Sequence, residues 1–355
     1  MSDLVEAVRT AVGALALPDG STLGARDMIR ALRIDGSTAR FVIEAPSAEV
    51  ARQMEPLRQA AEAAATTVPG ITAAQVALSA PTAAKGPPPT LKVGGHPTAQ
   101  EGPMRPAGVK TILAVGSGKG GVGKSTVSAN LAVALARAGK AVGLLDADIH
   151  GPSQPRMFGL TKRPASPDGK TIIPLEAHGV TVMSIGSMLA EEKAVVWRGP
   201  MLMGALQQML MQVAWGEKDV LIVDLPPGTG DVQLSLCQKA EPTGAIVVST
   251  PQDVALIDAR KALDAFATLK TPVLGMIENM AVYHCPNCGH ESHVFGHGGV
   301  AEEAAKMGVP LLGQLPIDLD TRIGGDTGKP VALGDSPMAQ AYAGLARRLI
   351  DGGIV

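Results

Sequence analysis

Short, continuous apolar runs recur along the chain from about residue 109 onward. They lie at residues 111–115, 142–145, 180–185, 220–223, 245–248 and 273–277. Helical patterns separate most of these runs, at residues 124–138, 201–213, 232–239 and 254–269. Short apolar strands that alternate with helices are typical of a parallel sheet covered on both faces. The pattern therefore predicts a doubly wound α/β domain over residues 109–355.

A smaller pattern precedes this domain. It consists of a helix face at residues 3–12, two short strands at 29–34 and 39–43, an alanine-rich helix from Ser47 to about Thr66, and a last strand at 71–78. This order predicts a small α+β domain over residues 1–80. The segment between the two domains, residues 81–108, holds seven prolines, five glycines and no aromatic residue. Such a composition predicts an interdomain linker.

Composition and charge exclude several classes of protein. The chain has 355 residues, of which 46% are hydrophobic, so a wholly disordered protein is excluded. A net charge of −2 and an aromatic content of 2% argue against nucleic-acid binding. Three cysteines are too few for a secreted disulfide scaffold, and neither a signal peptide nor a membrane-spanning apolar stretch is recognisable. We expect a cytoplasmic protein that binds neither nucleic acid nor membrane.

A glycine-rich loop follows the strand predicted at residues 111–115. It fits the pattern G-x-x-x-x-G-K-[ST] in a strand–loop–helix context. Glycines allow backbone N–H groups to converge on phosphate oxygens, and the following helix directs its positive end toward them. Lys124 would reach the outer phosphates of ATP, and the Ser125 hydroxyl would bind Mg²⁺. The candidate nucleotide-binding residues are Gly118, Lys119, Gly120, Gly121, Val122, Gly123, Lys124, Ser125 and Thr126.

The additional lysine in this loop, Lys119, is not part of an ordinary phosphate loop. A cation at this position would be able to reach the phosphates of a facing subunit, in the way that an arginine finger does. Because of this lysine, the sequence resembles the deviant Walker A ATPases, which include MinD, ParA, the ArsA pump ATPase and the nitrogenase iron protein. The resemblance implies that Lys119 acts as a catalytic residue across a homodimer that encloses the nucleotide.

Acidic residues follow two of the predicted strands. Asp146 and Asp148 follow the strand at 142–145, and Asp224 ends the strand at 220–223, where carboxylates would face the ligand crevice. Asp224 would support the Mg²⁺ shell, and helix capping is the alternative role for these acids. The resemblance implies that Asp146 contacts Mg²⁺ through water and that Asp148 positions the attacking water. It also implies that Asn279 and the segment containing Pro316 flank the adenine.

Two of the three cysteines lie in a histidine-rich segment, residues 283–297, as Cys285-x-x-Cys288. A zinc site that adds His290 and His293 is one interpretation, and a redox dithiol is a second, although the surroundings are not thioredoxin-like. The third is half of an iron–sulfur site, because a symmetric dimer supplies the four thiolates that a four-iron cluster needs. The two-fold axis implied by Lys119 favours the third interpretation.

The combined motifs resemble the Mrp/ApbC family of iron–sulfur cluster carriers. The resemblance rests on the glycine-rich loop and on residues 146–153, 197–201, 224–231, 250–256 and 285–288. It implies a homodimeric, Mg²⁺-dependent ATPase that binds an iron–sulfur cluster of the 4Fe-4S type, shared between two subunits, with cluster scaffold proteins and apo iron–sulfur proteins as partners. The alternatives are a MinD/ParA-like positioning ATPase and an ATPase with structural zinc at the cysteines. Residues 1–80 are similar to a small domain fused to bacterial members, but contain no cysteine.

Overall fold

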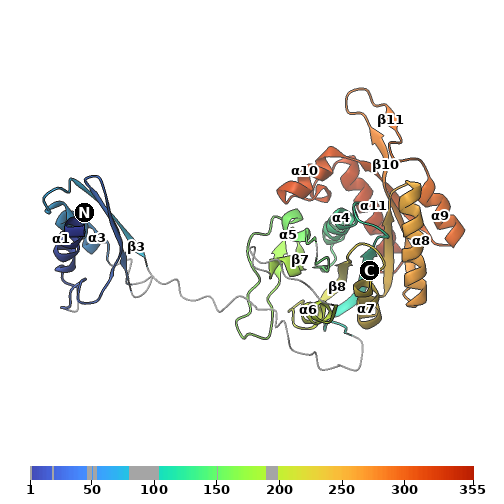
Figure 1. Ribbon diagram of the computed structural model, residues 1–355. Helices are drawn as coiled ribbons and strands as arrows, with labels where there is room; N and C mark the ends of the chain where they lie inside the picture. The colour runs from blue at the N-terminus through green and yellow to red at the C-terminus, as the bar shows by residue number, and fades with distance from the viewer. Residues whose placement is uncertain are drawn as a thin grey trace. The chain divides into compact units, whose positions relative to one another are not determined.

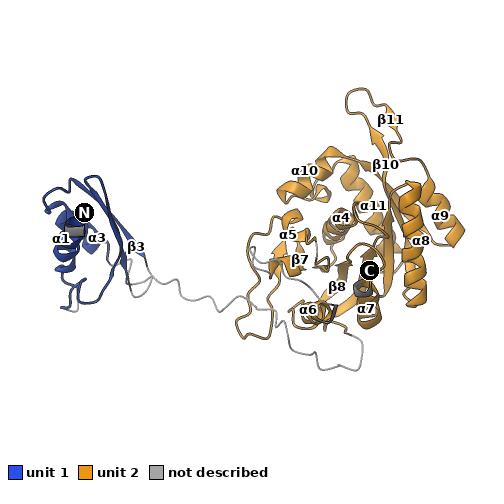
Figure 2. Cartoon of the chain, viewed as in Figure 1, with its two compact units in different colours: residues 1–85 blue, residues 86–355 orange. Residues whose placement is uncertain are grey.

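The computed structural model describes two compact units, residues 1–85 and residues 86–355 (Figure 2). The description covers residues 2–17, 20–45, 50, 54–79, 104–149, 151–188 and 199–355. Most of the predicted linker, together with Ser47, Trp197 and Arg198, lies outside the described residues.

Unit 1 is a three-stranded sheet with helices on one of its faces, in strand order β1-β2-β3. Strand β2 is antiparallel to β1 and parallel to β3. Side chains of α1, α3 and the inner sheet face form one core, which includes Val8, Phe41 and Ile43. The small α+β domain is therefore confirmed, with α1 at Ser2–Gly13, β1 at Ile29–Asp35, β2 at Thr38–Glu44, α3 at Glu55–Thr66 and β3 at Ala73–Ser79.

Helix α3 begins at Glu55, with Met54 as its N-cap and Pro56 in its first turn, so the N-cap lies seven residues after the predicted cap at Ser47. Proline has no N–H group and its ring clashes with the carbonyl four residues earlier, so it is tolerated only at the start of a helix. The prediction of one continuous helix from Ser47 was wrong because it overlooked this proline.

Unit 2 contains one large, mostly parallel sheet in the order β11-β10-β9-β4-β8-β5-β7-β6, with β12 paired to β10 (Figure 1). The predicted doubly wound fold is confirmed. Among the described strands of this sheet, only the pairings of β6 with β7 and of β11 with β10 are antiparallel. The strands are β4 Val109–Gly116, β5 Val142–Asp146, β6 Leu175–Ala177, β7 Val180–Ser184, β8 Lys218–Asp224, β9 Gly244–Ser249, β10 Val273–His284, β11 Glu291–Ser292 and β12 Leu311–Ile317.

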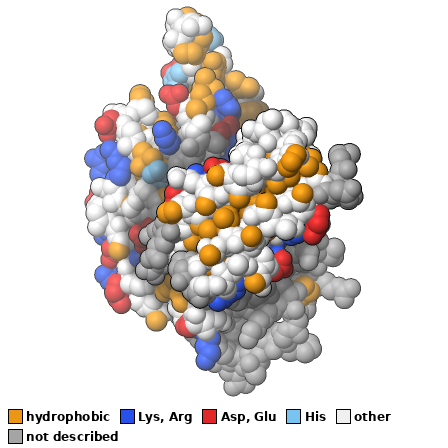
Figure 3. Space-filling view, turned by 90° about the vertical axis from the view of Figure 1, so that its left-hand side faces the viewer, with side chains coloured by type: hydrophobic (Ala, Val, Ile, Leu, Met, Phe, Trp, Pro, Cys, Tyr) orange, Lys and Arg blue, Asp and Glu red, His pale blue; other side chains and the backbone are white. Residues whose placement is uncertain are grey.

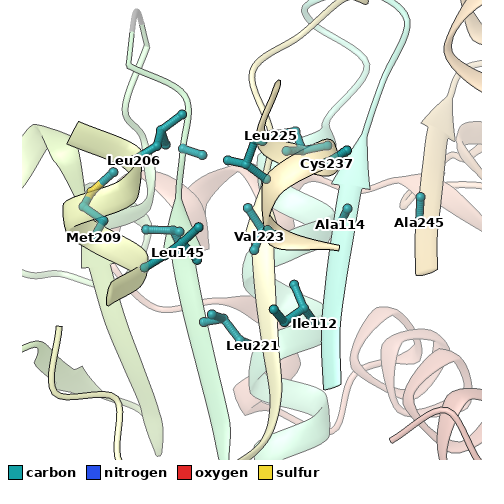
Figure 4. Close-up of a cluster of buried hydrophobic side chains, with 14 of the residues drawn as sticks. Ile112, Ala114, Leu145, Leu206, Met209, Leu221, Val223, Leu225, Cys237 and Ala245 are labelled. Atoms are coloured by element: carbon teal, nitrogen blue, oxygen red, sulfur yellow. The ribbon is translucent and has the colours of Figure 1, made fainter. Parts of the chain in front are cut away.

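Helices cover both faces of this sheet. Side chains of β4, β5, β8 and β9 meet α6 and α7 in one core, whose centre Figure 4 shows. Helices α4 and α11 cover the opposite face through a second core. The helices are α4 Lys124–Arg137, α5 Gln154–Met157, α6 Gly199–Met211, α7 Asp231–Ala240, α8 Asp253–Thr268, α9 Gly299–Met307, α10 Leu319–Thr327 and α11 Pro337–Asp351, with short 3₁₀ turns at Ile185–Ser187 and Val331–Leu333. Among the described helices, none is long and apolar enough to cross a membrane.

Strand β10 is longer than the sequence pattern indicates. The apolar pattern predicts a strand over 273–277, ending near Asn279, whereas β10 continues to His284. Its extension forms a hairpin with β11, in which Tyr283 pairs with Ser292 and His284 pairs with Glu291. Because these hairpin residues are polar and mostly exposed, the apolar pattern gave no sign of them. The hairpin projects from the body of unit 2 (Figure 1).

Candidate functional site

The glycine-rich loop connects β4 to α4, as the motif requires. Gly123 precedes the helix with a φ of 87°, a left-handed conformation that glycine adopts without strain. An open cavity of about 190 Å³ is lined by the whole loop from Lys119 to Thr126, together with Ser117, Asp148 and Pro227. The structure therefore brings Asp148, from the segment after β5, to the loop that the sequence identifies as a phosphate site.

Gly118 is the point where the loop packs against α8. A Cβ atom added at Gly118 would overlap the backbone carbonyl of Asp258. At Gly120 the backbone is ordinary, and an added Cβ would lie 4.0 Å from Pro227. These two positions of one loop therefore differ in whether they tolerate a side chain.

Replacing Gly118 with alanine is expected to lower the free energy of unfolding by about 1–3 kcal/mol, because the loop must move away from α8 to admit the methyl group. Gly120→Ala is the matched control and is expected to leave the stability within about 0.5 kcal/mol. Urea unfolding followed by circular dichroism measures both. Equal stability of the two variants would contradict the packing described here.

Lys124 lies at the base of the loop and is 5% exposed. Its ammonium nitrogen is 2.6 Å from an oxygen of Asp224, at the end of β8, and 3.1 Å from the Ser125 hydroxyl. Asp224 also accepts hydrogen bonds from Ser128 at 2.9 Å and from the Gln154 side chain at 2.9 Å. The expected association of Asp224 with the loop is thus present in the structure, through Lys124 and the first turn of α4.

Asp146 lies beside Asp224, because the two residues are register partners at the ends of β5 and β8. Both carboxylates are fully buried. Burial, with the neighbouring charge of Asp224, raises the pKa of Asp146 to about 7 against the opposing hydrogen bonds. These hydrogen bonds come from the backbone of Ser153 and Gln154 and from the Ser184 hydroxyl. Two adjacent buried carboxylates favour a nearby cation.

The oxygen atoms near the loop fit a hard cation such as Mg²⁺. The Ser125 hydroxyl and the two carboxylates are all oxygen donors, the kind of ligand that Mg²⁺ prefers. The buried Ser153 hydroxyl and the Gln154 side-chain oxygen have no hydrogen-bond partner in the described part of the chain. The donor chemistry of this region is therefore compatible with the magnesium predicted from the sequence.

Gln154 is a residue that the sequence reasoning missed. Its side chain is fully buried and donates to the Ser125 carbonyl at 3.0 Å as well as to Asp224. It therefore joins the phosphate loop to the end of β8. The sequence feature that could have identified Gln154 is its position directly after the segment 146–153. His150, within that segment, lies outside the described residues.

Asn279 lies against the phosphate loop rather than at a strand end. It is 8% exposed, and its side-chain amide donates to the Val122 carbonyl at 2.9 Å. Its register partner in β12 is Leu315, the residue before Pro316. The structure thus places Asn279 and Pro316 on adjacent strands, with Asn279 against the loop, and their contact with adenine stays a prediction.

The cysteine pair forms the turn of the β10–β11 hairpin. The Cys285 N–H donates to the His290 carbonyl at 3.0 Å, and Gly289, with a φ of 72°, donates to the Cys285 carbonyl at 2.8 Å. Hydrogen bonds from the backbone of Asn287 and Cys288, and from the Cys288 thiol, lower the pKa of Cys285. Cys288 is exposed and Cys285 partly so. The turn presents two adjacent thiols, one of which has a lowered pKa.

The histidines near this turn have other neighbours. His284 lies 3.4 Å from Glu291, and a ring nitrogen of His293 lies 3.1 Å from the Ala281 carbonyl. The rings of His293 and His297 are 4.2 Å apart. Nowhere in the described ranges do three His, Cys, Asp or Glu side chains gather in a metal-binding group. The described residues thus do not gather Cys285, Cys288, His290 and His293 into the zinc site that was one interpretation of this segment. Figure 3 shows histidine and hydrophobic side chains on the projecting hairpin at the top of the view.

Comparisons with known proteins agree with the combination of a phosphate loop and a cysteine turn. The family model described as NUBPL iron-transfer P-loop NTPase matches residues 108–350, and the model described as iron-sulfur cluster assembly protein matches residues 5–78. An iron-sulfur cluster carrier protein of Pseudomonas fragi is 53% identical over 244 residues, covering 68% of this chain and 85% of the relative. The protein of the same name from Aquifex aeolicus is 52% identical over 246 residues, covering 68% of each chain.

Solved structures show the same fold. A nucleotide-binding protein from Archaeoglobus fulgidus, in complex with ADP, is 42% identical with a TM-score of 0.57, covering 65% of this chain and 90% of its own. The cell division ATPase MinD of Pyrococcus furiosus has a TM-score of 0.51 at 24% identity, covering 68% and 98%, and supports the fold alone. The family model covers about two thirds of the chain, and relatives share about half of their residues with it. The predicted resemblance to iron–sulfur cluster carriers is therefore confirmed. The chain belongs to the NUBPL-type iron-transfer P-loop NTPases.

Proposed function

We propose that this protein is an ATP-binding and ATP-hydrolysing carrier that holds an iron–sulfur cluster between two copies of the chain and transfers it to apo-proteins. The observation that carries the proposal is the exposed turn with Cys285 and Cys288. Its two thiols are half of the ligands that a four-iron cluster requires, and relatives with about 50% identity are named iron-sulfur cluster carrier proteins. A second copy of the chain supplies the other two thiolates.

The nucleotide site operates through residues around the loop. Backbone N–H groups of the loop bind the phosphates of ATP, and Lys124 contacts the outer phosphates in exchange for its ion pair with Asp224. Ser125 would hold magnesium, which would neutralise phosphate charge, and Asp146 and Asp224 would support its shell. Asp148 orients the attacking water. The Lys119 carbonyl accepts from the Ser117 hydroxyl at 3.0 Å, whereas its side chain has no hydrogen-bond or ion-pair partner among the described residues. This ammonium group is therefore available to the nucleotide of the partner copy.

Strand β10 offers a physical connection between the two sites. Asn279 of this strand holds the Val122 carbonyl of the phosphate loop, and the same strand leads to Cys285. A change in the loop that alters this hydrogen bond would be transmitted along β10 to the cysteine turn. We therefore propose that the nucleotide state regulates how firmly the two copies hold the cluster. Cluster scaffold proteins would load it, and apo iron–sulfur proteins would receive it.

Transfer to a recipient tests this function. Anaerobically reconstituted protein is mixed with an apo-ferredoxin that binds a four-iron cluster, and the recipient is separated and assayed for cluster by visible absorption and for electron transfer. We expect the recipient to gain a cluster at a rate that changes when ATP is added. A recipient that gains none, while free iron and sulfide reconstitute it normally, would contradict the carrier function.

A further inference from the structure

Unit 1 leaves one face of its sheet uncovered by the described elements. Alternation along β2 directs Ala39, Phe41 and Ile43 into the core with α1 and α3, so the residues between them lie on the opposite face. Arg40 is one of these residues. Arg33 on β1 is its register partner, and Gln75 on β3 is its partner on the other side. All three side chains are exposed in one row across the sheet.

The row places two like charges directly opposite each other. Such a cross-strand pair destabilises a sheet, so the fold gains nothing from having arginine at both positions. Arg40 is partly compensated, since it donates to Asp35 at 3.0 Å and to Gln75 at 3.0 Å. The side chain of Arg33 has no hydrogen-bond or ion-pair partner among the residues that the structure describes. A residue that lowers the stability of the fold and makes no stabilising contact is a sign that the position serves binding.

The same face is hollowed. An open depression of about 480 Å³ is lined by both arginines and Gln75, with small apolar side chains beside them at Ala31, Val42 and Ala77. At the rim, the Glu62 carboxylate accepts the Val76 N–H of edge strand β3 at 3.3 Å. This contact occupies a backbone donor that an added strand would need, so a partner fits across the face rather than along the edge.

We propose that this face of unit 1 docks an acidic segment of a partner protein. Carboxylates of that segment pair with the guanidinium groups of Arg33 and Arg40, whose planar forks match a carboxylate in two-point contact. Apolar side chains of the segment cover Ala31, Val42 and Ala77. The small apolar floor favours a peptide that combines acidic and apolar residues over a simple anion, for which the floor offers no contact. All the residues that line this depression belong to unit 1.

Fluorescence anisotropy with the full-length chain tests the proposal. The probe is a short fluorescein-labelled peptide of glutamate, leucine and alanine, and its counterpart has glutamine in place of glutamate. Arg33→Gln and Arg40→Gln are each expected to weaken binding of the acidic peptide roughly tenfold, because a charge-assisted pair is lost. Arg9→Gln, on α1 of the same unit, removes the same charge outside the depression and is expected to leave affinity unchanged.

Thermal unfolding of the same variants separates binding from structure. Because Arg33 faces a like charge, Arg33→Gln is expected to keep or raise the unfolding midpoint of unit 1 while it weakens peptide binding. Three results would overturn the proposal. These are equal binding of the glutamine peptide, equal loss of affinity in Arg9→Gln, and loss of affinity that only accompanies unfolding. Displacement of the peptide by inorganic phosphate at equimolar concentration would also overturn it, by showing a site for simple anions.

Discussion

Replacing Cys285 and Cys288 together with serine is expected to abolish the iron and sulfide that the protein retains after anaerobic reconstitution. Serine keeps the size of each side chain but replaces a soft thiolate by a hard hydroxyl, which is a poor ligand for iron in such a cluster. The turn itself should persist, because it is held by backbone hydrogen bonds to His290 and from Gly289. Colorimetric iron and sulfide analysis after gel filtration measures the loss.

Cys237 provides the matched control for this experiment. It lies on α7, is 2% exposed, and burial raises the pKa of its thiol to about 12, so it is not a thiolate at neutral pH. We expect Cys237→Ala to retain the full content of iron and sulfide. If the double serine variant retains as much iron as Cys237→Ala, the cysteine turn is not the cluster site.

Replacing Lys119 with alanine is expected to lower the rate of ATP hydrolysis on the order of 10³-fold, the lower range of what an arginine finger contributes. The affinity for ATP should change much less, because Lys124 and the loop backbone remain. Lys124→Ala, by contrast, is expected to lose most nucleotide binding, since Lys124 is the buried cation at the base of the loop. Phosphate release and equilibrium binding of a fluorescent ATP analogue separate the two effects.

A mixing experiment distinguishes action of Lys119 on its own nucleotide from action on that of the partner. Lys119→Ala and Asp148→Asn chains are each expected to be nearly inactive alone, whereas a mixed dimer contains one site with its own Asp148 and the partner's intact lysine. An equimolar mixture should therefore recover about a quarter of the wild-type rate, because half of the dimers are mixed and each has one working site. No recovery would contradict action across the dimer.

The phosphate loop could be predicted from the sequence because its chemistry is local. The strand, the glycines and Lys124 are consecutive, so their spacing alone specifies how backbone N–H groups and the helix start are arranged. Asp148 and Asp224 were recognisable for a related reason. Parallel strands end at the same edge of the sheet, and these acids therefore meet the loop although they are distant in sequence.

Other features depend on contacts that no local pattern encodes. Gln154 joins Ser125 to Asp224 only because α5 packs against the start of α4, and a glutamine has no motif of its own. The hairpin that carries the cysteines lacks a periodic pattern of apolar residues, since its residues face away from the core. The opposition of Arg33 and Arg40 arises from the pairing register of β1 and β2, which includes a bulge between Arg30 and Arg33.

Native mass spectrometry of the anaerobically reconstituted protein tests the central proposal most directly. We expect a species of two chains that carries four iron and four sulfide atoms in total, and single chains that carry none. We also expect this species to disappear when Cys285 and Cys288 are replaced with serine. Iron or zinc bound stoichiometrically to single chains, with no cluster in the dimer, would contradict a cluster held between two copies.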